Sequence, residues 1–243
     1  MKLATTLITM VSLYALMACT NPTTQSNSAP ASEETTEAPQ ADAAGYTPLF
    51  NGQTTQGWRN YQSDGIGEEW KVEDGTLTLT GKGGGDIITE GQYENFDLML
   101  EWKISPNGNS GLFFHVVEAD SLQKVYHSGP EIQILDNDGH PDGKIITHRA
   151  GDNYDLQACS EETVRPVGEW NEVRLVINQG KVEQWLNGKM LVAYTLGSPE
   201  WEALYQKSKF TKWPMYGRGG KGHIALQDHG DQVWFRNIRI KEL

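Results

Sequence analysis

One short segment of the 243-residue chain combines side chains that could do chemistry. Alternate side chains of a β-strand point to opposite faces, so Ile132 and Ile134 would enter a core while Glu131 and Gln133 share the other face. Asp136 follows at the strand end, where a β-bulge could return it to that face. Carboxylates and an amide on a concave sheet suit sugar recognition and can serve as general acid and base. A solvated face without a ligand would show the same pattern.

Four further residues are candidates near the ends of expected strands. His115 alternates with apolar neighbours and could equally be a structural histidine. Gln227 lies near a strand end and His229 in the following turn, where loops over a rigid sheet often carry function, although a solvent-exposed turn histidine is the alternative. Arg236 is expected to be half-buried on the last strand. It would need an anionic partner such as one of the carboxylates above, and that pairing could be purely structural.

Few other patterns point to a ligand. The sequence has no glycine-rich phosphate loop, zinc signature, nucleophile elbow or EF-hand loop, so no cofactor is expected. Oxygen ligands clustered at residues 136–138 make a structural calcium ion conceivable. Trp185, Trp201 and Trp213 could stack on sugar rings, and core packing would explain them equally well.

The elements that must position these residues are mostly β-strands. Residues 96–104 alternate apolar and charged side chains, as expected for a half-buried strand. Turn residues at Asp74-Gly75 and Asn187-Gly188 predict hairpins, and residues 199–207 form the one expected short helix, with Ser198 as its N-cap. Many antiparallel strands at short spacing predict an all-β jelly-roll sandwich of two antiparallel sheets.

The N-terminus has the features of a bacterial lipoprotein. Residues 1–18 combine one basic residue with a short apolar run, as in a signal peptide. Ala18 precedes Cys19 as in a lipobox, so Cys19 is the predicted lipidation site, and an ordinary secretory signal is the alternative. Residues 19–45 are polar and acidic and predict a disordered stalk, which leaves one domain at 46–243.

The composition excludes some partners and cross-links. A net charge of −12 argues against nucleic acid as a partner. With Cys19 acylated, Cys159 remains alone, so the mature chain can form no internal disulfide.

Taken in order, the motifs resemble the 3-keto-disaccharide hydrolase domain family over nearly all of residues 46–243. They are Asn109 to Phe114, Gly129 to Asp136, Gly151 with Tyr154-Asp155, Gly168 to Asn171, Leu186 to Gly188, Leu226 to Gly230 and Phe235 to Ile238. The resemblance implies a concanavalin-like jelly roll, similar in layout to glycoside hydrolase family 16. It also implies cleavage of glycosides that a partner sugar oxidoreductase has oxidised at C3.

The resemblance further implies a mechanism. In family 16 the position equivalent to Gln133 holds a carboxylate. Because this chain has an amide there, the sequence argues against a retaining mechanism with paired carboxyl groups. A ketone at C3 instead acidifies the C2 hydrogen, so proton abstraction, elimination at C1 and hydration would give net hydrolysis. Glu131 or His229 would be the base. Arg236, Gln133 or Tyr154 would bind the ketone or enolate, and Asp136 or His115 would protonate the leaving group.

The main alternative is a non-catalytic carbohydrate-binding lipoprotein, since the same fold often serves as a lectin-like module. A structural or adhesive surface domain is a third reading. In each case the predicted location is the bacterial cell envelope, with the lipid anchor as the only membrane contact and the outer membrane as the expected site.

Overall fold

Two antiparallel sheets make up most of the computed structural model, which describes residues 41–243. The predicted signal peptide, Cys19 and most of the predicted stalk lie outside these residues. The larger sheet has the strand order β11-β10-β9-β6-β13-β4-β3, with β1 paired to β13. Its strands are β1 (Thr47–Pro48), β3 (Trp70–Glu73), β4 (Thr76–Leu79), β6 (Phe96–Ile104), β9 (Asn171–Asn178), β10 (Lys181–Leu186), β11 (Lys189–Thr195) and β13 (Val233–Glu242).

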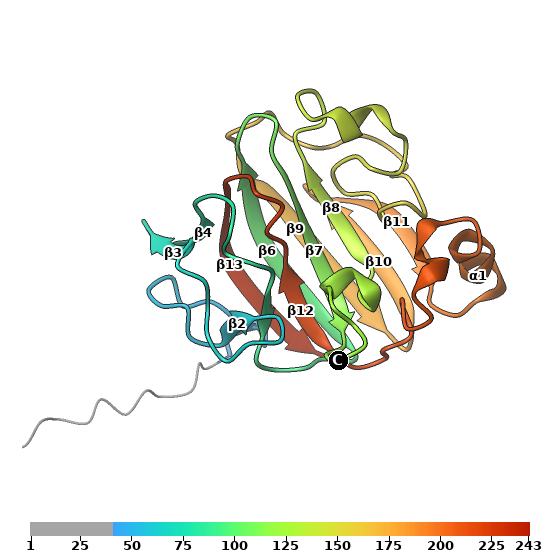
Figure 1. Cartoon of the computed structure of the whole chain (residues 1–243), viewed down its shortest axis with the longest axis horizontal. Coiled ribbons are helices and arrows are strands. Elements are labelled where there is room, and N and C mark those ends of the chain that lie inside the picture. Colours follow the sequence, from blue (N-terminus) through green and yellow to red (C-terminus); the bar gives the residue numbers. More distant parts are fainter. Residues whose placement is uncertain (1–40) are drawn as a thin grey trace, which may run out of the picture. The chain divides into compact units, whose positions relative to one another are not determined.

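The smaller sheet carries the predicted site residues Glu131 and Gln133, and its strand order is β2-β5-β12-β7-β8. Its strands are β2 (Trp58–Asn60), β5 (Ile87–Thr89), β7 (Asn109–Val116), β8 (Glu131–Leu135) and β12 (His223–Leu226). The two sheets lie face to face, with the loop after β8 and the segment of α1 on the side of β8 and β11, and the segment of β2 and β3 on the opposite side (Figure 1). The predicted all-β sandwich of two antiparallel sheets is therefore confirmed.

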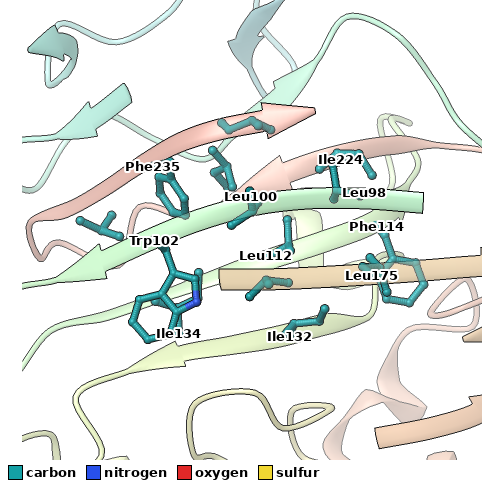
Figure 2. Close-up of a cluster of buried hydrophobic side chains, with 14 of the residues drawn as sticks. Leu98, Leu100, Trp102, Leu112, Phe114, Ile132, Ile134, Leu175, Ile224 and Phe235 are labelled. Atoms are coloured by element: carbon teal, nitrogen blue, oxygen red, sulfur yellow. The ribbon is translucent and has the colours of Figure 1, made fainter. Parts of the chain in front are cut away.

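The core lies between the sheets and follows from strand alternation. Leu98, Leu100 and Trp102 of β6 are buried, and they pack with Ile132 and Ile134 of β8 from the opposite sheet (Figure 2). Because Ile132 and Ile134 enter this core, the intervening residues of β8 must face away from it. That places Glu131 and Gln133 on the outer face of the smaller sheet, as their spacing predicts.

Turns and helices also follow local rules. The predicted hairpin turns at Asp74-Gly75 and Asn187-Gly188 have positive φ at both central residues, as a type I′ turn requires. The helix α1 (Pro199–Tyr205) begins as predicted, with the Ser198 hydroxyl accepting the N–H of Trp201, and ends two residues earlier than expected.

The 3₁₀ helices are η1 (Val125–His127), η2 (Pro141–Lys144) and η3 (Lys209–Lys212). Within residues 41–243, every helix is too short or too polar to cross a bilayer.

Candidate active site

A cavity of about 290 Å³ lies on the outer face of the smaller sheet. Its floor comes from strand residues and strand ends, and its wall comes from η1, η3 and the loop after β8. The lining residues are Asn109, Tyr126, Glu131, Gln133, Tyr154, Lys209, Phe210, Trp213, Gln227 and His229. Five predicted site residues, namely Glu131, Gln133, Tyr154, Gln227 and His229, are therefore brought together.

Glu131 is the carboxylate of this cavity. It is 5% exposed, and among the described residues no group donates a hydrogen bond or forms an ion pair with its side chain. Burial raises the pKa of Glu131 to about 8, against the opposing effect of the Lys209 ammonium. The side chain fits because the neighbouring strand has Gly111, where a Cβ would overlap with the Glu131 carboxylate.

Three amide side chains, those of Asn109, Gln133 and Gln227, line the cavity together with this carboxylate. Gln133 is almost fully buried, and its Oε1 accepts the N–H of Ile134 at 3.0 Å, which leaves its NH₂ group for the cavity. Gln227 is held by its backbone, since its N–H donates to Gly111 and its carbonyl accepts the Ser110 hydroxyl at 2.9 Å. Its buried Oε1 has no partner in residues 41–243, so this amide is free to meet a ligand.

His229 lies at the exposed rim of the cavity, in the loop after β12. Its ring meets the ring of His140 edge to face, with centroids 6.2 Å apart. The Nδ1 of His140 accepts the N–H of Asp142, so His140 is fixed at the start of η2.

The cavity wall is aromatic. Trp213 stacks on His127 with ring centroids 4.7 Å apart and an interplanar angle of 17°, and it meets Tyr126 edge to face at 5.3 Å. Trp213 is half-buried, so part of its ring remains open to the cavity. Of the three predicted sugar-stacking tryptophans, Trp213 lines this cavity. Trp201 is buried in a hydrophobic cluster with Phe210 and does not line the cavity, and Trp185 lies on β10 of the larger sheet.

Three predicted site residues lie outside the cavity. Asp136 does not return to the sheet face, because its carboxylate accepts backbone N–H groups of Asn107, Asp138 and Gly139 at 2.7–3.2 Å and closes the turns there. Its oxygens are thus occupied, and residues 41–243 contain no cluster of three or more His, Cys, Asp or Glu arranged to hold a metal ion.

His115 fails to face the cavity because β7 has a β-bulge. The register of β7 with β12 shifts at this point, and His115 has φ +51°. Its ring therefore packs edge to face on Phe96, and its Nε2 lies 2.8 Å from the carbonyl oxygen of Glu94.

Arg236 belongs to β13 of the larger sheet, so the predicted pairing with Glu131 or Asp136 is wrong. It pairs with Glu101 at 2.6 Å on the adjacent strand and stacks on Trp170, with Cζ 4.0 Å from the ring centroid. This pair is structural and lies on the outer face of the sandwich.

The structure adds residues that the sequence did not single out for this cavity. Lys209, Phe210 and Tyr126 come from short 3₁₀ helices without a motif, and Asn109 begins one of the motifs of the family resemblance. No local pattern points to these four residues, whereas the polar and glycine-rich loops at residues 136–159 and 213–221, where function often lies, supply the lining residues Tyr154 and Trp213.

The chain is similar in sequence and in structure to known proteins. The model of the 3-keto-alpha-glucoside-1,2-lyase-like domain matches residues 45–241. The chain belongs to the family of 3-keto-alpha-glucoside-1,2-lyase-like domains. The predicted family and the predicted glycoside-cleaving class of enzyme are thereby confirmed.

Individual relatives agree with this family. A protein of Bacteroides thetaiotaomicron named 3-keto-disaccharide hydrolase is 38% identical over 231 residues, covering 83% of this chain and 80% of the relative. A structure from Parabacteroides distasonis, designated a candidate glycosyl hydrolase, is 35% identical with a TM-score of 0.76, covering 83% of this chain and 95% of its own. A Bacillus subtilis protein with a galectin-like fold shares the fold alone, at 13% identity, a TM-score of 0.52 and coverage of 81% and 94%.

Proposed function

We propose that this lyase-like domain cleaves 3-keto-glycosides by removing the proton at C2, eliminating the C1 substituent and adding water. The observation that carries this proposal is the Glu131 carboxyl group, which lies buried without a hydrogen-bond or ion-pair partner among the described residues, in a cavity otherwise lined by amide, aromatic and basic groups. The name of the Bacteroides relative supports the substrate class.

The chemistry needs a base, and Glu131 is that base. A carboxylate with a pKa of about 8 is a much stronger base than an ordinary glutamate, and its pKa lies near the pH at which it must act. It takes the proton from C2, and the electrons of that C–H bond form the enolate with its charge on the C3 oxygen. When the enolate collapses, the C3 carbonyl forms again, a C1–C2 double bond appears and the C1–O bond breaks.

The other groups of the cavity complete the reaction. The NH₂ groups of Gln133 and Gln227 donate to the C3 oxygen, and the Lys209 ammonium stabilises its negative charge. His229 at the rim gives a proton to the departing aglycone oxygen. Water then adds its hydroxyl to C1 and gives its other proton back to His229, while Glu131 returns the proton to C2, so the net reaction is hydrolysis.

A retaining mechanism with two carboxyl groups fits the cavity less well. Glu131 is the one carboxylate among the residues that line it, and Gln133 occupies the position where a second carboxylate would be needed. Proton abstraction beside a ketone needs one carboxylate and hydrogen-bond donors, which is what this cavity offers.

The test compares Glu131→Gln with the wild type on an aryl 3-keto-glucoside and on the parent glucoside. Glu172→Gln, an exposed exchange on β9, is the matched control. We expect turnover of the keto sugar by the wild type and the control, and a loss of at least about a hundredfold in Glu131→Gln. A substrate deuterated at C2 should react more slowly. Undiminished turnover in Glu131→Gln would remove Glu131 as the base. Binding of both sugars without any turnover would instead support the carbohydrate-binding alternative.

We also propose that Cys19 is lipidated and holds the domain in the cell envelope, beside the oxidoreductase that makes the keto sugar. The signal peptide and the lipobox in the sequence support this proposal. Cys19→Ala in the full chain should abolish incorporation of labelled fatty acid and release the protein from the membrane fraction. Unchanged membrane retention of that variant would contradict it.

A further inference from the structure

A histidine between two carboxylates lies directly behind the cavity wall. The Nε2 of His148 is 3.2 Å from Asp155 Oδ1, and its Nδ1 is 3.5 Å from Asp142 Oδ2. The side chain is only 12% exposed. The Nε2 contact with Asp155 is the hydrogen bond of this ring, and the buried Nδ1 has no hydrogen-bond partner among residues 41–243.

The same imidazole supports one of the cavity residues. Its ring stacks on Tyr154 with centroids 4.2 Å apart and an interplanar angle of 27°. The Lys209 ammonium nitrogen also lies over the Tyr154 ring, 4.2 Å from its centroid. Tyr154 is therefore in contact with both His148 and Lys209. Its hydroxyl donates to Asp142 Oδ2 at 3.4 Å, so its ring orientation is also fixed.

Asp155 connects His148 to the segment that carries the ammonium group. While Oδ1 faces the imidazole, Oδ2 accepts the backbone N–H of Lys209 at 2.9 Å. The segments 142–155 and 209–213 are far apart in the sequence, and this aspartate joins them. Removing the histidine would release both Tyr154 and the start of η3.

The position of Lys209 matters for the proposed base. Its positive charge lowers the pKa of Glu131, whereas burial and the charges of Asp86 and Asp142 raise it. If Lys209 moves away from the cavity, the opposing charge is lost and the carboxyl group holds its proton more tightly.

We propose that His148 is a positioning residue, which holds Tyr154 in the cavity wall by stacking on its ring and holds Lys209 there through its hydrogen bond to Asp155. Asp142, Asp155 and Tyr154 are the titratable groups that face it in residues 41–243, and Lys209 lies over the same tyrosine ring. Its effect on turnover rests on the proposed function, whereas its effect on Glu131 does not.

The test uses His148→Phe, which keeps a ring against Tyr154 but has no nitrogen to hydrogen-bond Asp155. We expect kcat/KM on the 3-keto-glucoside to fall on the order of tenfold to a hundredfold, as a small misplacement of catalytic groups does. The titration midpoint of the Glu131 carboxyl carbon, followed by ¹³C NMR, should move to higher pH. His115→Phe is the control, because that histidine is also shielded from solvent but lies outside the cavity, and it should leave the Glu131 midpoint unchanged.

A second variant keeps the proposal testable if His148→Phe does not fold. Asp155→Asn removes the negative charge beside His148, and asparagine tolerates the φ of +64° at this position. Loss of this negative charge alone would lower the pKa of a nearby carboxyl group, so a Glu131 midpoint that still moves to higher pH reports displacement of Lys209. An unchanged midpoint in folded variants would overturn the positioning role. Absence of wild-type turnover would count against the proposed function, and the NMR titration would still decide the role of His148.

Discussion

The Glu131 carboxylate occupies space that exists because residue 111 on the adjacent strand has no side chain. Gly111 has ordinary strand geometry, so alanine would not strain its backbone, but its methyl group would displace the carboxylate. We expect Gly111→Ala to fold and to lose at least about tenfold in kcat/KM, since misplaced catalytic groups are costly. Gly65→Ala is the control, because a Cβ there meets nothing within 4 Å. Equal activity of both variants would show that the base has room to move.

The pH dependence of turnover follows from the role of Glu131. Burial raises its pKa to about 8, and a base works only in its ionised form. We therefore expect kcat/KM to rise with pH and to level off above about pH 8, as measured with initial rates across pH 5–10. A rate that falls through this range would assign Glu131 the role of acid instead.

The same carboxyl group makes stability depend on pH. Its pKa is raised from 4.5 in an exposed chain to about 8 in the fold, so the folded state binds the proton more tightly. Its contribution to the unfolding free energy is therefore lost as pH rises from about 4.5 to about 8.

Glu131→Gln removes this dependence. We expect the variant to be more stable than the wild type by roughly 2–5 kcal/mol at pH 9 and nearly equal at pH 4.5, in urea unfolding at both values. Parallel pH dependence in the two proteins would show that the buried carboxylate is not the cause. Such a gain would also identify Glu131 as a residue that lowers stability for the sake of activity.

Trp213 should contribute to substrate affinity more than to the chemical step. Its ring is held by stacking on His127 and forms part of the cavity wall. Trp213→Ala should raise KM by about tenfold, equivalent to the ~1.4 kcal/mol expected for one aromatic contact, with a smaller effect on kcat. Trp185→Ala, on the larger sheet, is the matched control and should leave KM unchanged.

Arg236 should be dispensable for turnover. Its partners are Glu101 and Trp170 on the larger sheet, and the ion pair is partly exposed. We expect Arg236→Ala to cost at most about 1 kcal/mol of stability and to keep wild-type kcat/KM. A large loss of activity with normal folding would reopen a functional role for this residue.

Alternation within single strands was enough to predict the floor of the site. The contrast between Ile132 and Ile134 on one face and Glu131 and Gln133 on the other is local and needs no tertiary knowledge. Alternation could not reveal which sheet a strand joins. Arg236 follows its strand pattern correctly, yet β13 belongs to the other sheet.

Other features depend on contacts distant in the sequence. The bulge that turns His115 away is a mismatch between two strands, and the carboxylate of Asp136 is used by backbone groups of neighbouring turns. Lys209 lines the cavity where Asp155, in the loop after β8, binds the start of η3, a contact that no local pattern indicates.

The division of the cavity into a strand-built floor and a loop-built wall has an evolutionary consequence. The floor residues are fixed by sheet register, so a one-residue slip would remove Glu131 and Gln133 together. The wall comes from irregular segments, which tolerate insertions and replacements. On the proposed function, changes in the wall would alter the aglycone that is accepted, while the floor would keep the proton-transfer chemistry.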